Sequence, residues 1–439
     1  MEKPSFKEAL LFWLKLGFVS FGGPAGQIAI MHDFLVTRKK WISESRFLHA
    51  LNFTMLLPGP EAQQLATYAG WLLHGTRGGL VAGAFFVLPS MLILFALSAL
   101  YVSFGNIPWI YSLFAGLKPA VVAIVVMALV KISSKSLKSV FHYVLAVAAF
   151  VCLFFLNIAF PLIIVGSILI AVIVFRIRPS LFKGRNNDVI DSDNSEEEYY
   201  INSNSVLAEA GLSWGRLARQ VTVSTLVWAI PLVVFYFFTS DAQFWEELIF
   251  FFTRAAFVTF GGAYAVLPYV AQVSVEELGW LTELQMIDGL ALGETTPGPL
   301  VMVLAFVGFM AGYGQYSDSV IMGGLGLVVT TFYTFVPCFF FIFAGAPIIE
   351  KTRENNQVKQ VLGVVTAAVV GVMLNLTIYL GKAVVFPSGG LDLNGIDWIT
   401  LAWVVVSIVA LYRFKANVMG WIAVSATFGL IRFLILGPF

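Results

Sequence analysis

Two short motifs, a Gly-Gly pair preceded by Phe and Pro-Gly-Pro, each occur twice in the chain within long apolar stretches. Gly-Gly stands at residues 22–23 and 261–262, and Pro-Gly-Pro stands at residues 58–60 and 297–299. Proline lacks a backbone donor and glycine lacks a side chain, so both motifs are expected to interrupt helices. A helix that begins at such a break presents unpaired N–H groups and a positive dipole end, which suits an anion. The alternative is that these residues only kink and pack helices.

We expect the four breaks, two hydroxyl groups beside them and two cations in apolar segments to bind an anion. Lys15 and Arg254 each stand seven residues before the first glycine of their pair. A cation in an apolar segment usually faces a cavity or a partner, but the alternative is snorkelling to the nearest polar surface. The predicted substrate-binding residues are Lys15, Ser20, Gly22, Gly23, Pro24, Pro58, Gly59, Pro60, Arg254, Thr259, Gly261, Gly262, Pro297, Gly298 and Pro299.

Two carboxylates flank the Pro-Gly-Pro motifs asymmetrically. Glu61 follows the first motif directly, whereas Glu294 precedes the second, and neither has an acidic counterpart in the other half. A titrating carboxylate beside an anion site suits proton coupling, so both residues are proton-coupling candidates. The alternative is helix capping, with Glu61 in a first helical turn and Thr295 or Thr296 capping a helix at Pro297.

No other chemistry is visible in the sequence. The four histidines and the two cysteines show no metal-ligand spacing, and the chain contains no Walker loop, nucleophile elbow or zinc signature. We therefore predict no catalytic residues, no metal site and no cofactor. The chain is not expected to be an enzyme.

The composition explains why these motifs lie in apolar surroundings. Of the 439 residues, 59% are hydrophobic and 12% are charged, and the mean hydropathy is +0.88. Soluble domains carry about 25% charged residues, so soluble enzymes and secreted modules are excluded. A net charge of +1 offers no basic excess for nucleic acid. The chain is a polytopic membrane protein whose partner is the lipid bilayer.

The two halves of the chain resemble each other at a constant offset of 239 residues. From Phe18 to Pro60 the ungapped match contains 12 identities, concentrated in FVSFGG, WISE and PGP and their counterparts FVTFGG, WLTE and PGP. WISE and WLTE predict helix starts with Ser43 and Thr282 as N-caps. Repeats of this size are typical of transporters.

The predicted fold is an all-α polytopic membrane protein with two inverted repeats joined by an extra helix. Each repeat has two broken, re-entrant hairpins and about four spanning helices. The domains are 1–176 (first repeat), 177–216 (polar cytoplasmic linker), 217–238 (inverting connector helix) and 239–439 (second repeat). The acidic run 188–198 is interpreted as solvated linker, with a regulatory contact as the alternative. The expected spans are 78–104, 108–131, 138–158, 160–175, 318–349, 360–382, 398–412 and 417–437.

Basic residues predict the orientation. The first repeat has Arg38, Lys39 and Lys40 in the loop where the second has Glu277, Leu278 and Gly279, a change of charge that indicates inversion. If every broken segment returns to the side it entered, the N-terminus and the linker are cytoplasmic in a multi-pass protein of the cell (inner) membrane. The alternative is that the broken segments span the membrane completely.

Longer blocks carry a family resemblance: SFGGPAGQIAIMH at 20–32, RKKWISESRFLHALNFTMLLPGPEAQQLATYAGW at 38–71, FVTFGGAYAVLPY at 257–269 and GETTPGP at 293–299. They strongly resemble the chromate ion transporter family, in its long, two-domain form. The resemblance implies export of chromate, a tetrahedral dianion similar to sulfate, and hence chromate resistance.

The membrane potential favours such export, because a dianion leaving a negative interior gains about 4.6 kcal/mol per 100 mV. We therefore expect a secondary transporter driven by the potential or an ion gradient. A sulfate or other oxyanion transporter is the nearest alternative, and a membrane scaffold or membrane-embedded enzyme is the alternative of another class. A homodimer is left open.

Overall fold

The computed structural model describes residues 4–21, 23–177, 198–202, 214–239, 241–349, 356–387 and 395–437. Within these residues the chain folds into sixteen α-helices, which confirms the all-α prediction. Six helical segments are long and apolar enough to cross a membrane, so the chain is a multi-pass membrane protein. They are Glu61–Phe104, Pro108–Ser136, Trp214–Phe238, Val320–Gly345, Gly363–Val385 and Val418–Leu436.

The two halves begin with the same series of elements, which is two helices, a π-helical turn and a third helix. The first half comprises α1 (Phe6–Val19), α2 (Gly23–His32), η1 (Asp33–Arg38), α3 (Glu44–Thr54), α4 (Glu61–Phe104), α5 (Pro108–Ser136), α6 (Val140–Phe154) and α7 (Phe160–Ile177). After α8 (Trp214–Phe238), the second comprises α9 (Ala242–Val258), α10 (Ala263–Ala271), η4 (Gln272–Glu277), α11 (Glu283–Thr295), η5 (Leu300–Met302), α12 (Val303–Gln315), α13 (Val320–Ile349), α14 (Asn356–Val385), α15 (Trp398–Tyr412) and α16 (Val418–Leu436). The π-helical turns η1 and η4 differ in number by the same 239 residues as the sequence match.

The predicted helix breaks are confirmed at all four motifs. α1 and α9 end just before the Gly-Gly pairs, and α4 and η5 begin just after the Pro-Gly-Pro motifs. Gly59, Gly262 and Gly298 have φ values of 119°, 99° and 97°, which side chains on L-residues disfavour. The two predicted N-caps are also confirmed, because the hydroxyls of Ser43 and Thr282 accept from Arg46 N–H and Gln285 N–H.

The start of the expected span 78–104 agrees with a break inside α4. This element covers 44 residues, but His74 and Gly75 have non-helical backbone conformations, with φ of −138° and 63°, and they divide it into two helices. By contrast, α6 and α15 have 15 residues each, a rise of about 22 Å that falls short of a hydrocarbon layer of about 30 Å.

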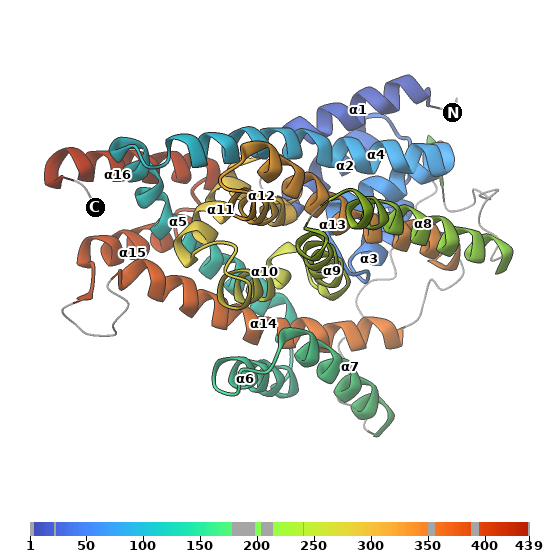
Figure 1. Cartoon of the computed structure of the whole chain (residues 1–439). Coiled ribbons are helices and arrows are strands. Elements are labelled where there is room, and N and C mark those ends of the chain that lie inside the picture. The colour runs from blue at the N-terminus through green and yellow to red at the C-terminus, as the bar shows by residue number, and fades with distance from the viewer. Residues whose placement is uncertain are drawn as a thin grey trace.

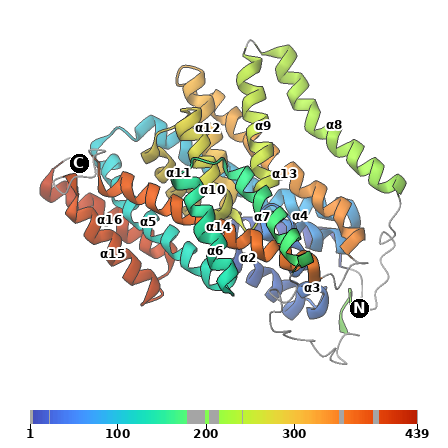
Figure 2. The ribbon, with the colours of Figure 1, turned by 90° about the horizontal axis from the view of Figure 1, so that it is seen from below.

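The halves interlock through α5 and α14. α5 packs against α15 and α16, α14 packs against α6 and α7, and α5 and α14 also pack against each other. Glycines permit this close approach: a Cβ at Gly116 on α5 would lie 2.3 Å from the carbonyl oxygen of Ser425, and one at Gly371 on α14 would lie 2.0 Å from that of Ala146. The short helices α10 and α11 therefore lie in the interior (Figures 1 and 2).

The helix that joins the halves lies on the outside. α8 contains no buried residue and runs along one edge of the molecule in both views (Figures 1 and 2). In a bilayer, its apolar surface would contact lipid. The helix covers residues 217–238, the segment that the sequence predicts to connect the halves.

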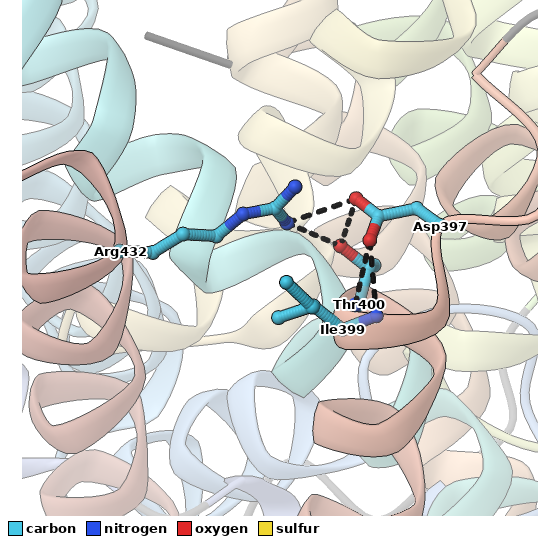
Figure 3. Close-up of polar contacts among 4 residues, drawn as sticks. All are labelled: Asp397, Ile399, Thr400 and Arg432. Atoms are coloured by element: carbon cyan, nitrogen blue, oxygen red, sulfur yellow. Dashed lines mark hydrogen bonds and ion pairs between the residues drawn. The ribbon is translucent and has the colours of Figure 1, made fainter. Parts of the chain in front are cut away.

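α15 and α16 are joined by a polar network at the opposite end of the molecule (Figures 1 and 3). Asp397, the N-cap of α15, accepts from the backbone N–H groups of Ile399 and Thr400 at 3.1 and 3.0 Å. Its Oδ2 atom lies 2.8 Å from Nη1 of Arg432 on α16. This ion pair fixes the start of α15 to its neighbour.

Part of the linker docks on the first repeat. Ile201 N–H donates to the carbonyl oxygen of Trp41 at 2.9 Å, and Ser43 N–H donates to that of Ile201 at 2.8 Å. The side chains of Glu198 and Lys40 form an ion pair beside these bonds. Residues 198–202 therefore make a defined contact, whereas the acidic run up to residue 197 lies outside the described residues.

Candidate functional site

The four helix breaks meet in the interior through hydrogen bonds between the halves. Gly59 N–H donates to the carbonyl oxygen of Thr259 at 2.7 Å, and Gly298 N–H donates to that of Ser20 at 2.9 Å. The two bonds are related by the 239-residue offset, because Ser20 corresponds to Thr259 and Gly59 to Gly298. Each Pro-Gly-Pro tip is therefore bound to the Gly-Gly segment of the other half.

Both Pro-Gly-Pro tips pack closely against a helix of the opposite half. A Cβ at Gly298 would lie 2.8 Å from Cβ of Ser90 on α4. A Cβ at Gly59 would lie 2.7 Å from Sγ of Cys338 on α13 and 2.8 Å from Nε2 of Gln64. Glycine is therefore required at each tip for space as well as for its positive φ.

Two glutamines of the first half hold both Pro-Gly-Pro tips. Gln27 Nε2 donates to the carbonyl oxygens of Gly298 and Ser20 at 2.6 and 3.2 Å. Gln64 Nε2 donates to the carbonyl oxygen of Pro58 at 2.7 Å. The Oε1 atoms of both glutamines are buried and accept no hydrogen bond from the described residues. Polar groups at the tips are therefore not fully satisfied within this part of the protein.

A cavity of about 670 Å³ lies beside the first Gly-Gly segment, and most of the residues that line it are apolar. Gly23 and Pro24, at the start of α2, line it together with Tyr264 of α10, Glu294 of α11 and Lys131 of α5. Tyr264 Oη donates to Oε1 of Glu294 at 2.5 Å. The cavity thus combines a helix N-terminus, an ammonium group and a hydrogen-bonded carboxylate, which are groups that can bind an anion and exchange a proton.

The second predicted carboxylate lies at a different tip. Oε1 of Glu61 lies 3.9 Å from the position that a Cβ on Gly262 would occupy, so it faces the Gly-Gly segment of the second half. Glu61 is also the first residue of α4, which agrees with the capping alternative. The proposed capping by Thr295 or Thr296 is wrong, because their hydroxyls donate to the preceding carbonyls of α11 and the next helix begins at Leu300.

Most of the predicted binding residues are brought together, but the two cations are not. Lys15 and Arg254 lie on the exposed faces of α1 and α9, away from the buried tips. On α1, the exposed residues Leu11 and Phe18 share this face with Lys15. Gly22 lies outside the described residues. The predicted residues at the tips are Ser20, Gly23, Pro24, Pro58, Gly59, Pro60, Thr259, Gly261, Gly262, Pro297, Gly298 and Pro299.

Several polar residues at this site were not predicted. Gln27 and Tyr264 both lie inside repeat blocks, a position that marked them as neighbours of the breaks. Lys131 stands at the end of an apolar run, so the sequence indicates only that it lies near the end of a membrane span. Asn417, in the loop before α16, reaches the cavity through the interlocking of the halves. Among the described residues, no group of histidine, cysteine and carboxylate side chains is suited to a metal ion.

Broken helices that meet inside a multi-pass helical bundle, beside a cavity that contains charged groups, are the arrangement typical of secondary transporters. The family model described as Chromate transporter matches residues 7–173 and 246–430. The chain therefore belongs to the chromate transporter family, whose members are transporters rather than enzymes.

Curated relatives match most of the chain. It is 28% identical to the chromate transport protein of Cupriavidus metallidurans, over 94% of this chain and 89% of the relative. It is 27% identical to the probable chromate transport protein of Synechococcus elongatus, over 86% and 85%. An uncharacterised transporter of Methanocaldococcus jannaschii is 25% identical over 98% and 96%. No solved structure matches the chain.

Proposed function

We propose that this protein is a secondary carrier that exports chromate through the cavity beside the helix breaks, and thereby confers chromate resistance. The observation that carries the proposal is the paired contact of the breaks, in which Gly59 binds Thr259 and Gly298 binds Ser20 across the halves. The matching family and two relatives named for chromate transport support chromate as the substrate.

The cavity offers the interactions that a tetrahedral dianion needs. The N-terminus of α2 at Gly23 and Pro24 supplies a positive dipole end, and Lys131 supplies a full positive charge. With the N-terminus and the linker in the cytoplasm, Lys131 belongs to the cytoplasmic basic residues, so the cavity opens toward the substrate inside the cell. The membrane potential then favours release of the dianion outside by about 4.6 kcal/mol per 100 mV.

The breaks give the carrier its moving parts. In this proposal the two halves are inverted repeats, and each broken segment is a re-entrant hairpin whose tip can exchange hydrogen bonds with the other half. Glu294, hydrogen-bonded to Tyr264 in the cavity, and Glu61, which faces the Gly-Gly segment of the second half, are the groups that would couple transport to protons.

Sulfate is the second candidate substrate. It has the same tetrahedral shape and charge as chromate, and the groups that line the cavity do not distinguish the two ions.

Transport by purified protein in liposomes tests the proposal. Chromate is loaded inside, a potential or a pH gradient is imposed separately, and sulfate is added as a competitor. We expect chromate efflux that follows the imposed potential. Sulfate flux without chromate flux would change the substrate, and flux of neither ion would favour a scaffold or enzyme.

A further inference from the structure

A second cavity, which is polar, has a volume of about 400 Å³. Like the first cavity, it is lined by residues of α5 and α11. It contains Lys118 of α5, Asp288 of α11 and Tyr101 of α4. The side chains of Lys118 and Asp288 are only 8 and 5% exposed, and Nζ lies 3.6 Å from Oδ2. Tyr101 Oη donates to the same Oδ2 atom at 2.9 Å. The other carboxylate oxygen, Oδ1, accepts no hydrogen bond from any described residue.

The two cavities follow one another along α5 and α11. On α5, Lys118 lines the second cavity and Lys131 lines the first, and these residues are separated by about 20 Å of helix rise. On α11, Asp288 likewise lines the second cavity and Glu294 lines the first, and the two residues are separated by about 9 Å of helix rise. α5 and α11 pack directly against each other. The two cavities therefore lie one after the other along the contact between α5 and α11.

The Lys118–Asp288 pair is poorly explained as a stabilising contact. The N···O separation of 3.6 Å exceeds hydrogen-bond length, and the ammonium also lies 5.3 Å from the ring centre of Tyr111. Buried ion pairs of this kind can often be replaced by apolar residues without loss of stability, because desolvation offsets the attraction. A buried ammonium with a loosely held carboxylate in a polar cavity is instead suited to exchange one anion for another.

We propose that Lys118 and Tyr101 form a second binding position for the transported oxyanion, with Asp288 as the counter-ion that the oxyanion displaces. This inference rests on the proposed function and extends it to a site at the far end of the route. The ammonium of Lys118 and the hydroxyl of Tyr101 both donate hydrogen bonds, and the carboxylate of Asp288 occupies the place of the ligand. The oxyanion would move along α5 from Lys131 to Lys118.

Neutralising the pair tests whether Lys118 binds substrate or only balances Asp288. Chromate and sulfate fluxes are measured in liposomes for the wild type, Lys118→Met, Asp288→Asn and the double variant Lys118→Met/Asp288→Asn. The single Lys118 variant leaves a buried carboxylate unpaired, so the double variant keeps the test valid if that single variant does not fold. The matched control is Arg432→Met/Asp397→Asn, which removes a similar ion pair away from both cavities.

We expect the double variant to lose about tenfold or more of the oxyanion flux, while the control double variant stays within about twofold of the wild type. Asp288→Asn should lower the KM for the transported ion several-fold, because it leaves the ammonium free for the oxyanion. Near-normal flux in Lys118→Met/Asp288→Asn would overturn the inference and assign the pair a purely structural role.

The flux measured for the wild-type protein distinguishes a failure of this inference from a failure of the proposed function. Chromate flux in the wild type with undiminished flux in the double variant overturns only the Lys118 site. Sulfate flux without chromate flux, abolished in the double variant, overturns chromate as substrate and supports the site. Flux of neither ion by the wild type overturns both.

Discussion

The two halves share a backbone arrangement but divide the polar chemistry between them. Both Pro-Gly-Pro tips donate a glycine N–H to the opposite half. The amide groups that hold the tips, Gln27 and Gln64, belong only to the first half, and the hydrogen-bonded carboxylate of the cavity, Glu294, belongs only to the second. The hydrogen bonds between the helix breaks are therefore symmetric, whereas residues that differ between the halves supply the polar side chains beside them.

Adding one methyl group at a Pro-Gly-Pro tip should impair transport more than any other change below. Gly298→Ala should abolish transport, because the new Cβ would meet Cβ of Ser90 at 2.8 Å in a backbone with φ of 97°. Gly59→Ala should be milder, because its Cβ would meet the side-chain ends of Cys338 and Gln64, whereas that of Gly298→Ala would meet a Cβ atom and a backbone carbonyl. Liposome flux and thermal stability measure both variants.

Gly279→Ala is the control for backbone conformation alone. Gly279 also has positive φ, at 61°, but a Cβ there would meet no atom within 4 Å. It should lose about 1–2 kcal/mol of stability and retain transport. Equal damage in all three variants would show that the contacts at the tips do not matter.

Glu294 and Glu61 lie in different surroundings, so neutralising them should reduce chromate flux to different degrees. Glu294→Gln should slow chromate flux about tenfold or more, equivalent to about 1.4 kcal/mol, because Glu294 lines the cavity. Glu61→Gln should have a smaller effect, since Glu61 lies at the other Gly-Gly segment. Initial efflux rates with and without a pH gradient measure both, and a larger effect of Glu61→Gln would reverse the roles.

Replacing each glutamine by the residue of the other half tests the amide contacts. Gln27 and Gln64 correspond to Val266 and Val303. Gln27→Val should lower stability by about 1–3 kcal/mol, because two buried carbonyls lose a donor. Gln64→Val should cost less, since the amide donates to one backbone carbonyl. Thermal unfolding in detergent measures both, and an unchanged midpoint for Gln27→Val would contradict the role of this contact.

The ion pair between Asp397 on α15 and Arg432 on α16 should have only a weak, pH-dependent influence on stability. Partial burial alone would raise the pKa of Asp397, but hydrogen bonds from Thr400 and Arg432 outweigh it and hold the pKa below the ordinary 3.8. The stabilisation that follows from a lowered pKa is present above the ordinary pKa and is lost as pH falls through the lowered value. Asp397→Asn should therefore flatten the acid side of the stability profile.

The first half offers a control for this pH effect. Ser139 is the N-cap of α6 as Asp397 is of α15, and its hydroxyl contacts Nδ1 of His142 instead of forming an ion pair. Ser139→Ala should leave the acid limb unchanged. A profile that keeps its wild-type slope below about pH 4 in Asp397→Asn would exclude the ion pair as its source.

Local chemistry made the helix breaks predictable, whereas distant contacts were hidden. Proline and glycine interrupt a helix wherever they stand, so the breaks at residues 22–23, 58–60, 261–262 and 297–299 could be read directly. The hydrogen bond between Gly298 and Ser20 joins residues almost 280 positions apart, and only the packing of the halves creates it.

The two predicted cations show that the sequence alone does not reveal which face of a helix is buried. Lys15 and Arg254 stand at equivalent positions of the repeat, but the face on which they lie depends on what α1 and α9 pack against. In the sequence, Lys118 is an isolated cation in an apolar run, and Asp288 belongs to none of the repeated motifs. Their proximity follows from the packing of α5 against α11, which the sequence does not express.

Protection of a single cysteine by chromate would test most directly whether the oxyanion occupies the cavity beside the tips. Met127→Cys places a thiol in the cavity wall, and Arg413→Cys places one on the exposed loop outside it. The rate of modification by a membrane-impermeant thiol reagent is measured with and without chromate. We expect chromate to slow modification at position 127 several-fold and to leave position 413 unchanged. Equal rates at position 127 with and without saturating chromate would contradict the account.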